Sequence, residues 1–142
     1  TPKLMQMKAT VLVVFLMFFS NISYTQTALP LKSKSMLSGK KVYDMYCQAC
    51  HQADGNGVPR LNPPLAGTVY VTGSKTRLID IVLKGLTDPL EINGEDYNNP
   101  MAAHSFLTDQ QIADVLTFIR NSFGNKAGAI SVAEVKKQRA KK

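Results

Sequence analysis

Both cysteines of this 142-residue chain lie in one short run, Cys47-Gln48-Ala49-Cys50-His51. On one helical turn, two thiols at this spacing reach the two vinyl groups on one side of a porphyrin and form thioether bonds. The imidazole of the next residue then points at the iron as its proximal ligand. The Cys-x-x-Cys-His run therefore predicts one covalently attached haem c, bound through Cys47 and Cys50, with His51 as an iron ligand.

Three other interpretations of the run are weaker. A disulfide or thiol-redox pair calls for a preceding strand and a sheet, and the sequence indicates neither. A zinc site formed by the run together with His104 is awkward, because Cys50 and His51 are adjacent and cannot easily share one tetrahedral ion. Chance occurrence on a plain surface is the third interpretation. Haem attachment is favoured over all three.

The positive charge of the chain lies at its ends. The formal net charge is +7, yet residues 26–135 hold ten basic and ten acidic residues. Two lysines in residues 1–25 and five basic residues in residues 136–142 supply the excess. We therefore expect no nucleic-acid partner, because a binding domain for nucleic acid carries its basic residues on the folded domain itself.

The first 25 residues have the pattern of a secretory signal peptide. Lys3 and Lys8 precede an eleven-residue apolar run at residues 9–19, and polar residues follow it. As a helix this run rises about 16 Å, roughly half of the hydrocarbon core of a bilayer. We expect cleavage between Ser20 and Ala28 and an exported, periplasmic protein. An uncleaved signal and a buried core helix are the alternatives, so membrane association is allowed but not required.

The length suits one compact domain with extensions. Residues 26–37 are polar and basic and are expected to form a linker before a domain at residues 38–125. Ser38 is the expected N-cap of a helix to about Cys47, with Val42, Met45 and Tyr46 on one face. A basic tail at residues 126–142 follows, in which Ser131 and Glu134 fit the capping box of a short helix.

Two further helices and a hairpin are expected within the domain. A helix is expected from about Ser74 to Lys84, ended by Gly85. Asn93-Gly94 fits a type I′ turn in a small hairpin at residues 90–97. The last helix has Thr108 and Gln111 as its capping box, an apolar stripe that reaches Phe123, and Gly124 just beyond its end. The prediction is an all-α fold of three main helices with long loops, and loops of this length need something large to pack on.

The chain resembles class I monohaem cytochrome c over roughly residues 36–125. Gly39 and Tyr43 stand eight and four residues before the first motif cysteine, where that family packs a glycine and an aromatic ring on its last helix. Val115 and Phe118 are the expected other half of this contact. The resemblance implies the cytochrome c fold wrapped round the haem. It also implies that the Pro63 carbonyl, in a Pro-Pro-Leu-Ala-Gly run, accepts the proton of the His51 imidazole.

Met101 is the expected second iron ligand. It follows Pro100 in a non-helical loop before the last helix, where the family places its distal methionine. His104 as the ligand and an open sixth position are the alternatives. Met36 and Met45 lie too close to the motif to reach the opposite face of the haem. The other expected walls of the haem pocket are aromatic and aliphatic: Tyr46, Leu65, Leu78, Val82, Phe106 and Leu116.

These features together predict an electron carrier and not an enzyme. A haem with two protein ligands transfers single electrons between redox partner proteins, whose identity the sequence leaves open. Val58, Pro59, Ala102 and Ala103 are the expected docking patch at the exposed haem edge. Two alternatives remain: a haem-bearing subunit of a larger respiratory or dehydrogenase complex, and a peroxidase-like or ligand-binding haem protein with an open iron.

Overall fold

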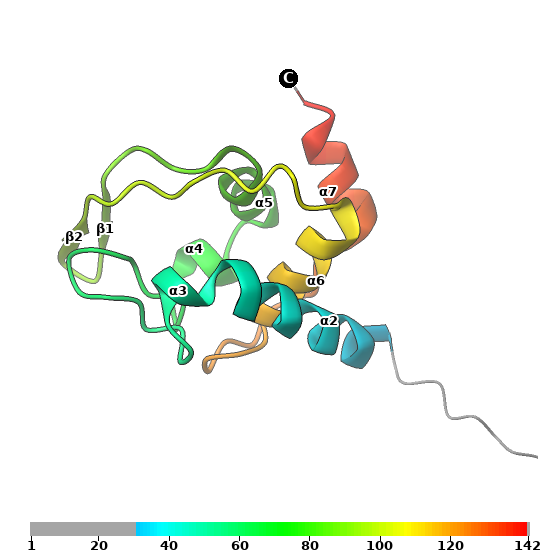
Figure 1. Cartoon of the computed structure of the whole chain (residues 1–142), viewed down its shortest axis with the longest axis horizontal. Coiled ribbons are helices and arrows are strands. Elements are labelled where there is room, and N and C mark those ends of the chain that lie inside the picture. The colour runs from blue at the N-terminus through cyan, green and yellow to red at the C-terminus, as the bar shows by residue number, and fades with distance from the viewer. Residues whose placement is uncertain (1–30, 142) are drawn as a thin grey trace, which may run out of the picture.

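A computed structural model describes residues 31–141 (Figure 1). The expected signal peptide at residues 1–25 and the first part of the expected linker lie outside the described residues. The described chain is mostly helical, with a single small hairpin, as the all-α prediction requires. Its elements are α2 (Leu31–Tyr46), α3 (Gln48–His51), α4 (Val69–Thr72), α5 (Lys75–Lys84), β1 (Leu90–Ile92), β2 (Glu95–Tyr97), α6 (Asp109–Ile119) and α7 (Val132–Arg139).

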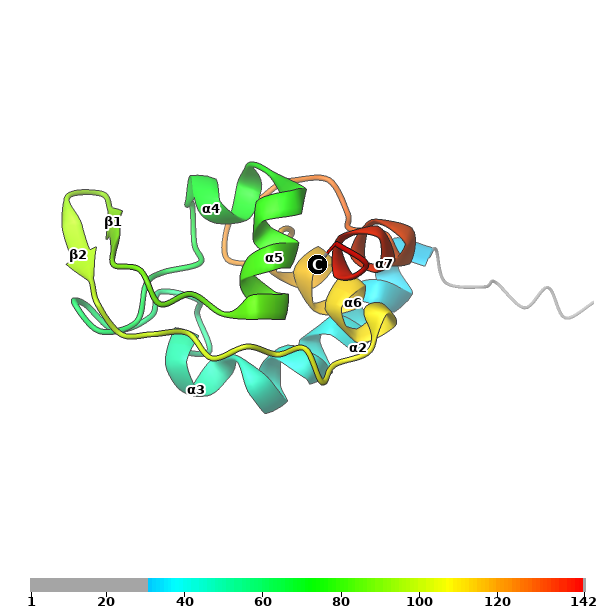
Figure 2. The same ribbon diagram turned by 90° about the horizontal axis from the view of Figure 1, so that it is seen from above.

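The framework of the fold is the crossing of α2 over α6, which the two views of the ribbon show (Figures 1 and 2). The helices meet at Gly39, where a Cβ would collide with the backbone carbonyl of Asp114 and the Cβ of Phe118. One turn further along α2, the buried ring of Tyr43 lies with its centroid 5.5 Å from that of Phe118. The contact expected from Gly39 and Tyr43 is therefore present.

The first helix is longer than the sequence predicted. It begins at Leu31, so the expectations of a linker over residues 31–37 and of an N-cap at Ser38 are wrong. The hydroxyl of Ser35 donates to the side chain of Asp114 on α6, and this tertiary contact holds the extra turns in place. Met45 is also 71% exposed and lies off the inner face, which Gly39, Val42 and Tyr43 form.

The middle elements form where they were expected. Ser74 caps α5 by accepting from the backbone N–H of Arg77, and Gly85 ends the helix. The two strands pair antiparallel, with Leu90 opposite Tyr97. Asn93 and Gly94 both have positive φ, as a type I′ turn requires.

The last core helix starts as predicted and ends early. Thr108 and Gln111 form the expected capping box of α6. The helix stops at Ile119, so Phe123 is not part of its stripe and Gly124 is not its C-terminal cap. The reason is tertiary, because the buried side chain of Asn125 donates to the Ile119 carbonyl and turns the chain back on itself.

The C-terminal segment is a docked helix and not a free tail. Ser131 and Glu134 form the expected capping box of α7. Val135, on the inner face of the same helix, is fully buried. Lys75 Nζ lies 2.9 Å from Glu134 Oε1, and Arg139 Nε lies 2.6 Å from Asp109 Oδ1, so α7 is tied to both α5 and α6. Within residues 31–141, no helix has the length and apolar character needed to cross a bilayer.

The Gly39→Ala substitution tests the close crossing of α2 and α6. The added methyl group must push the helices apart, and we expect the free energy of unfolding to fall by about 2–3 kcal/mol in denaturant titrations. Gly128→Ala is the matched control, because the nearest side-chain atom there, Lys75 Cε, is 3.7 Å away. An equal loss in both variants would contradict the crossing.

Glu134 makes the docking of α7 dependent on pH. Hydrogen bonds from the Ser131 backbone and from Lys75 lower the pKa of Glu134 from 4.5 to about 2. A carboxylate with a lowered pKa contributes stability that is complete above its ordinary pKa and is lost as the pH falls through the folded-state pKa.

Glu134→Gln should therefore lower the free energy of unfolding near neutral pH, by no more than about 1 kcal/mol because the ion pair is partly exposed. The difference from the unsubstituted protein should shrink below pH 4.5 and vanish near pH 2. Thermal unfolding at several pH values measures it. Glu91→Gln, on the exposed face of β1, is the control, and a pH-independent difference for Glu134→Gln would disprove the assignment.

Candidate functional site

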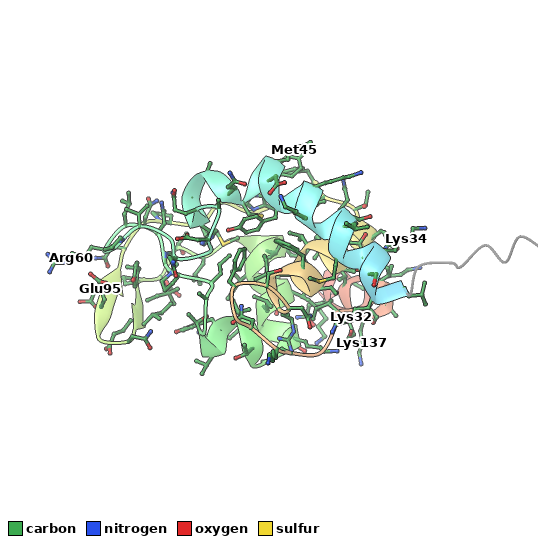
Figure 3. All side chains as sticks on the ribbon, turned by 90° about the horizontal axis from the view of Figure 1, so that it is seen from below. Lys32, Lys34, Met45, Arg60, Glu95 and Lys137 are labelled. Atoms are coloured by element: carbon green, nitrogen blue, oxygen red, sulfur yellow. The ribbon has the colours of Figure 1, made fainter. Side chains whose placement is uncertain are left out.

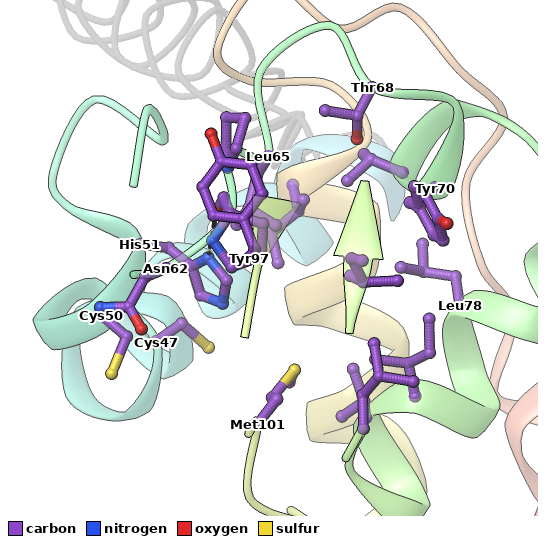
Figure 4. Close-up of a pocket in the computed structure, with 18 of the residues that line it drawn as sticks. Cys47, Cys50, His51, Asn62, Leu65, Thr68, Tyr70, Leu78, Tyr97 and Met101 are labelled. Atoms are coloured by element: carbon purple, nitrogen blue, oxygen red, sulfur yellow. Dashed lines mark hydrogen bonds between the residues drawn. The ribbon is translucent and has the colours of Figure 1, made fainter. Parts of the chain in front are cut away.

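An apolar cavity lies between α3, the loop at residues 62–68, α4, α5, the hairpin and α6 (Figure 4). Cys47, Cys50 and His51 line one side of it. Met101 lines it from the segment that follows the hairpin. The remaining walls are largely aliphatic and aromatic, as the buried centre of a small domain requires. The residues that form them come from most segments of the described chain.

The two cysteines form no disulfide with each other and are held by one turn of helix. The carbonyl of Cys47 accepts the backbone N–H groups of Cys50 and His51, at 3.2 and 3.0 Å. Figure 4 shows their sulfur atoms pointing in different directions, which disfavours a disulfide. Burial raises the pKa of the Cys47 thiol to about 11, so this sulfur is an uncharged, apolar part of the cavity wall.

The zinc alternative lacks a ligand set. Within residues 31–141, no group of three or more histidine, cysteine or acidic side chains is placed to hold a metal ion. Cys47, Cys50 and His51 share the cavity with His104 but do not form such a cluster.

The imidazole of His51 is buried and held in one orientation. Its Nδ1 atom lies 3.0 Å from the carbonyl oxygen of Pro63, the contact implied by the resemblance. Burial is the main reason why the pKa of His51 is lowered, so the ring is neutral and donates from Nδ1. The Nε2 atom is then left with its lone pair, which is the form of imidazole that binds iron.

A glycine allows the Pro63 carbonyl to reach His51. Gly57 has a positive φ of 66°, and a Cβ at this position would collide with the carbonyls of Asn62 and Pro63. Its N–H donates to the His51 carbonyl over 3.0 Å. The loop thus folds back against α3, and the close backbone packing sets the position of Pro63.

Asn125 holds the other end of this loop, and nothing in the sequence pattern singled it out. Its side-chain N–H groups donate to the carbonyls of Leu65 and Ile119, at 3.0 and 2.9 Å. Its Oδ1 accepts the N–H of Gly67 at 2.9 Å. The buried amide therefore ties the loop after Pro63 to the end of α6.

Met101 is fixed in position by its backbone. Its N–H and C=O pair with Leu86 at 2.8 and 2.9 Å, which joins this segment to the end of α5. Figure 4 shows its sulfur pointing into the cavity that the His51 imidazole also enters. Neither Met36 nor the exposed Met45 lines this cavity, in agreement with their expected exclusion.

Two buried polar atoms at the cavity have no hydrogen-bond partner among the described residues. They are Thr68 Oγ1 and His104 Nδ1, and both residues line the cavity. A buried polar group without a partner costs free energy unless a bound group satisfies it. The residues present fit a haem. The apolar walls suit its macrocycle, and the imidazole and thioether groups suit its iron. The unpaired atoms of Thr68 and His104 suit its polar edge.

Most of the expected pocket walls are confirmed and one is wrong. Tyr46, Leu65, Leu78, Val82 and Leu116 line the cavity. Phe106 does not. It is 65% exposed, and its ring packs edge-on against Tyr46 with centroids 5.4 Å apart. Its neighbour Leu107 takes the buried position instead, so the chain presents Phe106 to solvent.

The hairpin contributes walls that the sequence did not reveal. Ile92 and Tyr97 are both buried and line the cavity. A hydrogen bond of 2.7 Å from Asn99 to Asn62 ties the segment after the hairpin to the loop before Pro63. The alternation of apolar and polar residues within a strand predicts which side chains point inward. Nothing in the local sequence shows which cavity those side chains would face.

One of the four expected docking residues lines the cavity. Ala102 lines the cavity and is exposed, and Ala103 and Pro59 are exposed as well. Val58 is half-buried because it pairs with Asn62.

Comparison with known proteins gives a family and several relatives. The family model described as "Cytochrome c" matches residues 37–123. The cytochrome c-552 of Thermus thermophilus is 38% identical over 113 residues, which cover 73% of this chain and 86% of that protein.

Cytochrome subunits of dehydrogenases are similar too. The cytochrome c subunit of the quinone alcohol dehydrogenase of Gluconacetobacter polyoxogenes is 40% identical over 118 residues, 81% of this chain. The gluconate 2-dehydrogenase cytochrome c subunit of Pantoea cypripedii is 39% identical over 109 residues, 72% of this chain. The matches span 25% and 24% of those subunits, so this chain corresponds to about a quarter of each.

Proposed function

The chain belongs to the cytochrome c family, and we propose that it carries single electrons on a haem held by His51 and Met101. Membership of the family confirms the all-α cytochrome c fold and the electron-transfer function. It also confirms one covalent haem c on Cys47 and Cys50. The two axial ligands, the absence of enzymatic activity and the docking surface are our proposals.

The bound haem supplies an iron that gains and loses one electron. The chain's own residues hold it and keep out water. Thioether bonds from Cys47 and Cys50 would hold the haem next to α3. The Pro63 carbonyl orients the His51 ring by accepting from Nδ1, which presents Nε2 to the iron. The apolar walls exclude water from the site, so little solvent has to reorganise.

The observation that carries the proposal is the shared cavity of His51 and Met101. The two side chains lie 50 residues apart in the sequence and enter the same space (Figure 4). His51 and Met101 would together hold the iron and leave it no position for a substrate, which suits the site to electron transfer. A thioether ligand favours ferrous iron, so the pair of ligands raises the reduction potential.

His104 is the rival for the sixth position. Its Nδ1 is buried and lacks a partner, but its backbone N–H donates to the Val82 carbonyl over 2.8 Å. Its ring lies against exposed Phe106, with centroids 5.7 Å apart. These contacts place His104 on the rim side of the cavity, and we assign ligation to Met101.

The Met101→Ala variant tests this assignment. Loss of the thioether should lower the midpoint potential and let the reduced protein bind carbon monoxide, which the unsubstituted protein should resist. Optical spectra in both redox states, with and without carbon monoxide, measure both effects. Met45→Ala is the matched control because the Met45 side chain is exposed. Unaltered spectra for Met101→Ala would show that another residue is the ligand.

We propose that redox partners dock on the rim beside Ala102, Ala103 and Pro59. The exposed Phe106 and the ring of Tyr46, which also lines the cavity, extend this apolar rim. Transient contacts of this kind bury less than about 1,200 Å².

Ala103→Asp places a charge on this rim. We expect it to slow reduction by respiratory membranes of the source organism at least about threefold, because a desolvated carboxylate opposes docking. The midpoint potential should not change. Ala129→Asp, on an exposed loop, is the control, and equal rates for the two variants would rule out this docking surface.

The dehydrogenase relatives favour one second candidate: that this chain works as the bound electron-entry unit of a larger complex. We propose export to the periplasm in either case, on the basis of the signal-like residues 1–25. Purification under mild conditions separates the candidates, because a bound unit leaves the membrane together with its partner subunits.

A further inference from the structure

The end of the molecule that carries the start of α2 and the whole of α7 is rich in unpaired cations. The five exposed lysines concerned, called here the basic end, are Lys32, Lys34, Lys136, Lys137 and Lys141. None of them forms an ion pair within residues 31–141. Figure 3 shows Lys32, Lys34 and Lys137 at one end of the long axis, with Arg60 and Glu95 at the other.

The carboxylates of the elements beneath these lysines are already engaged. Asp109 pairs with Arg139, and Glu134 pairs with Lys75. Asp114 accepts from Ser35 and Gln110. Arg139 and Lys75 therefore offset Asp109 and Glu134. Asp114, whose two donors are neutral, leaves one negative charge against the five lysines of the basic end. The basic end keeps a net positive charge, whereas residues 26–135 as a whole are neutral.

The cations are held on a fixed surface. Val135 and Gln138 are buried on the inner face of α7, which turns Lys136 and Lys137 outward. Gln138 donates to Asp80 on α5, which adds to the ion pairs that dock this helix. A cation presented by a docked helix loses little side-chain and backbone entropy when it meets a partner, compared with one on a free tail.

The arrangement of the lysines points to the kind of partner. They are exposed on α2, on α7 and just after α7, and none of them lines the cavity. Clustered lysines on a surface are attracted to anionic lipid headgroups, and each lysine near such a surface contributes independently. A broad spread of lysines, without a pocket, suits a headgroup surface better than a single ligand.

We propose that the basic end docks on an anionic lipid bilayer. The hairpin and α3, which border the haem cavity, lie toward the other end of the molecule (Figure 1). Docking through the basic end therefore leaves the rim of the cavity free for redox partners while the protein moves along the membrane surface. This inference concerns lipid binding and stands apart from the choice of axial ligands.

The test is co-sedimentation of the purified exported holoprotein with vesicles at physiological ionic strength. Vesicles of phosphatidylcholine mixed with phosphatidylglycerol should bind the protein, and vesicles of phosphatidylcholine alone should not. Replacing two lysines in Lys136→Gln/Lys137→Gln should lower the partition coefficient roughly tenfold or more. The matched control, Lys41→Gln/Arg60→Gln, removes the same charge from elsewhere and should lower it much less.

Any one of three results would overturn the proposal. Equal losses in the two double variants would show that net charge alone matters. Equal binding to both kinds of vesicle would show that anionic headgroups are not what attracts the protein. Binding only to an acidic protein, and not to anionic vesicles, would assign the basic end to a protein partner. The orientation is checked with a small soluble reductant, which should reduce bound and free protein at similar rates, since a strong slowing would mean that the cavity faces the lipid.

Discussion

The chain is arranged round one apolar cavity between α3 and Met101, and the rest of the structure depends on what binds there. Most of the helices are short, the segments between them are long, and every described element except α7 contributes walls to this cavity. A haem covalently bound to Cys47 and Cys50 supplies the missing apolar volume. Folding and cofactor attachment are therefore coupled, because the long segments that line the cavity pack round the haem.

Backbone polar groups do much of the positioning in this site. The Pro63 carbonyl orients His51, the Leu86 backbone holds Met101, and the Asn125 amide pins the carbonyl of Leu65. Such contacts depend little on the side chains of the residues that supply the carbonyls. They also keep buried N–H and C=O groups paired in a region with no regular sheet or long helix.

The electrostatic organisation separates two tasks along the molecule. Around the cavity the described chain is apolar, and the His51 imidazole is neutral because it is buried. The uncompensated lysines lie at the end that carries α7 and the start of α2. Redox contact and surface attachment can therefore use different faces without competing.

The sequence alone determined the local features. The Cys47 to His51 run specified haem attachment because its chemistry depends on residue type and spacing, and the Thr108 and Ser131 capping boxes specified helix starts because their bonds span only three residues. The contact of Gly39 and Tyr43 with the last helix was implied by the resemblance to class I cytochrome c. By contrast, no local signal gave the start of α2 at Leu31, the end of α6 at Ile119, the outward turn of Phe106 or the role of Asn125. Each of these is set by partners distant in the sequence, such as Asp114 for Ser35 and Leu65 for Asn125, and only the tertiary structure decides which distant groups meet.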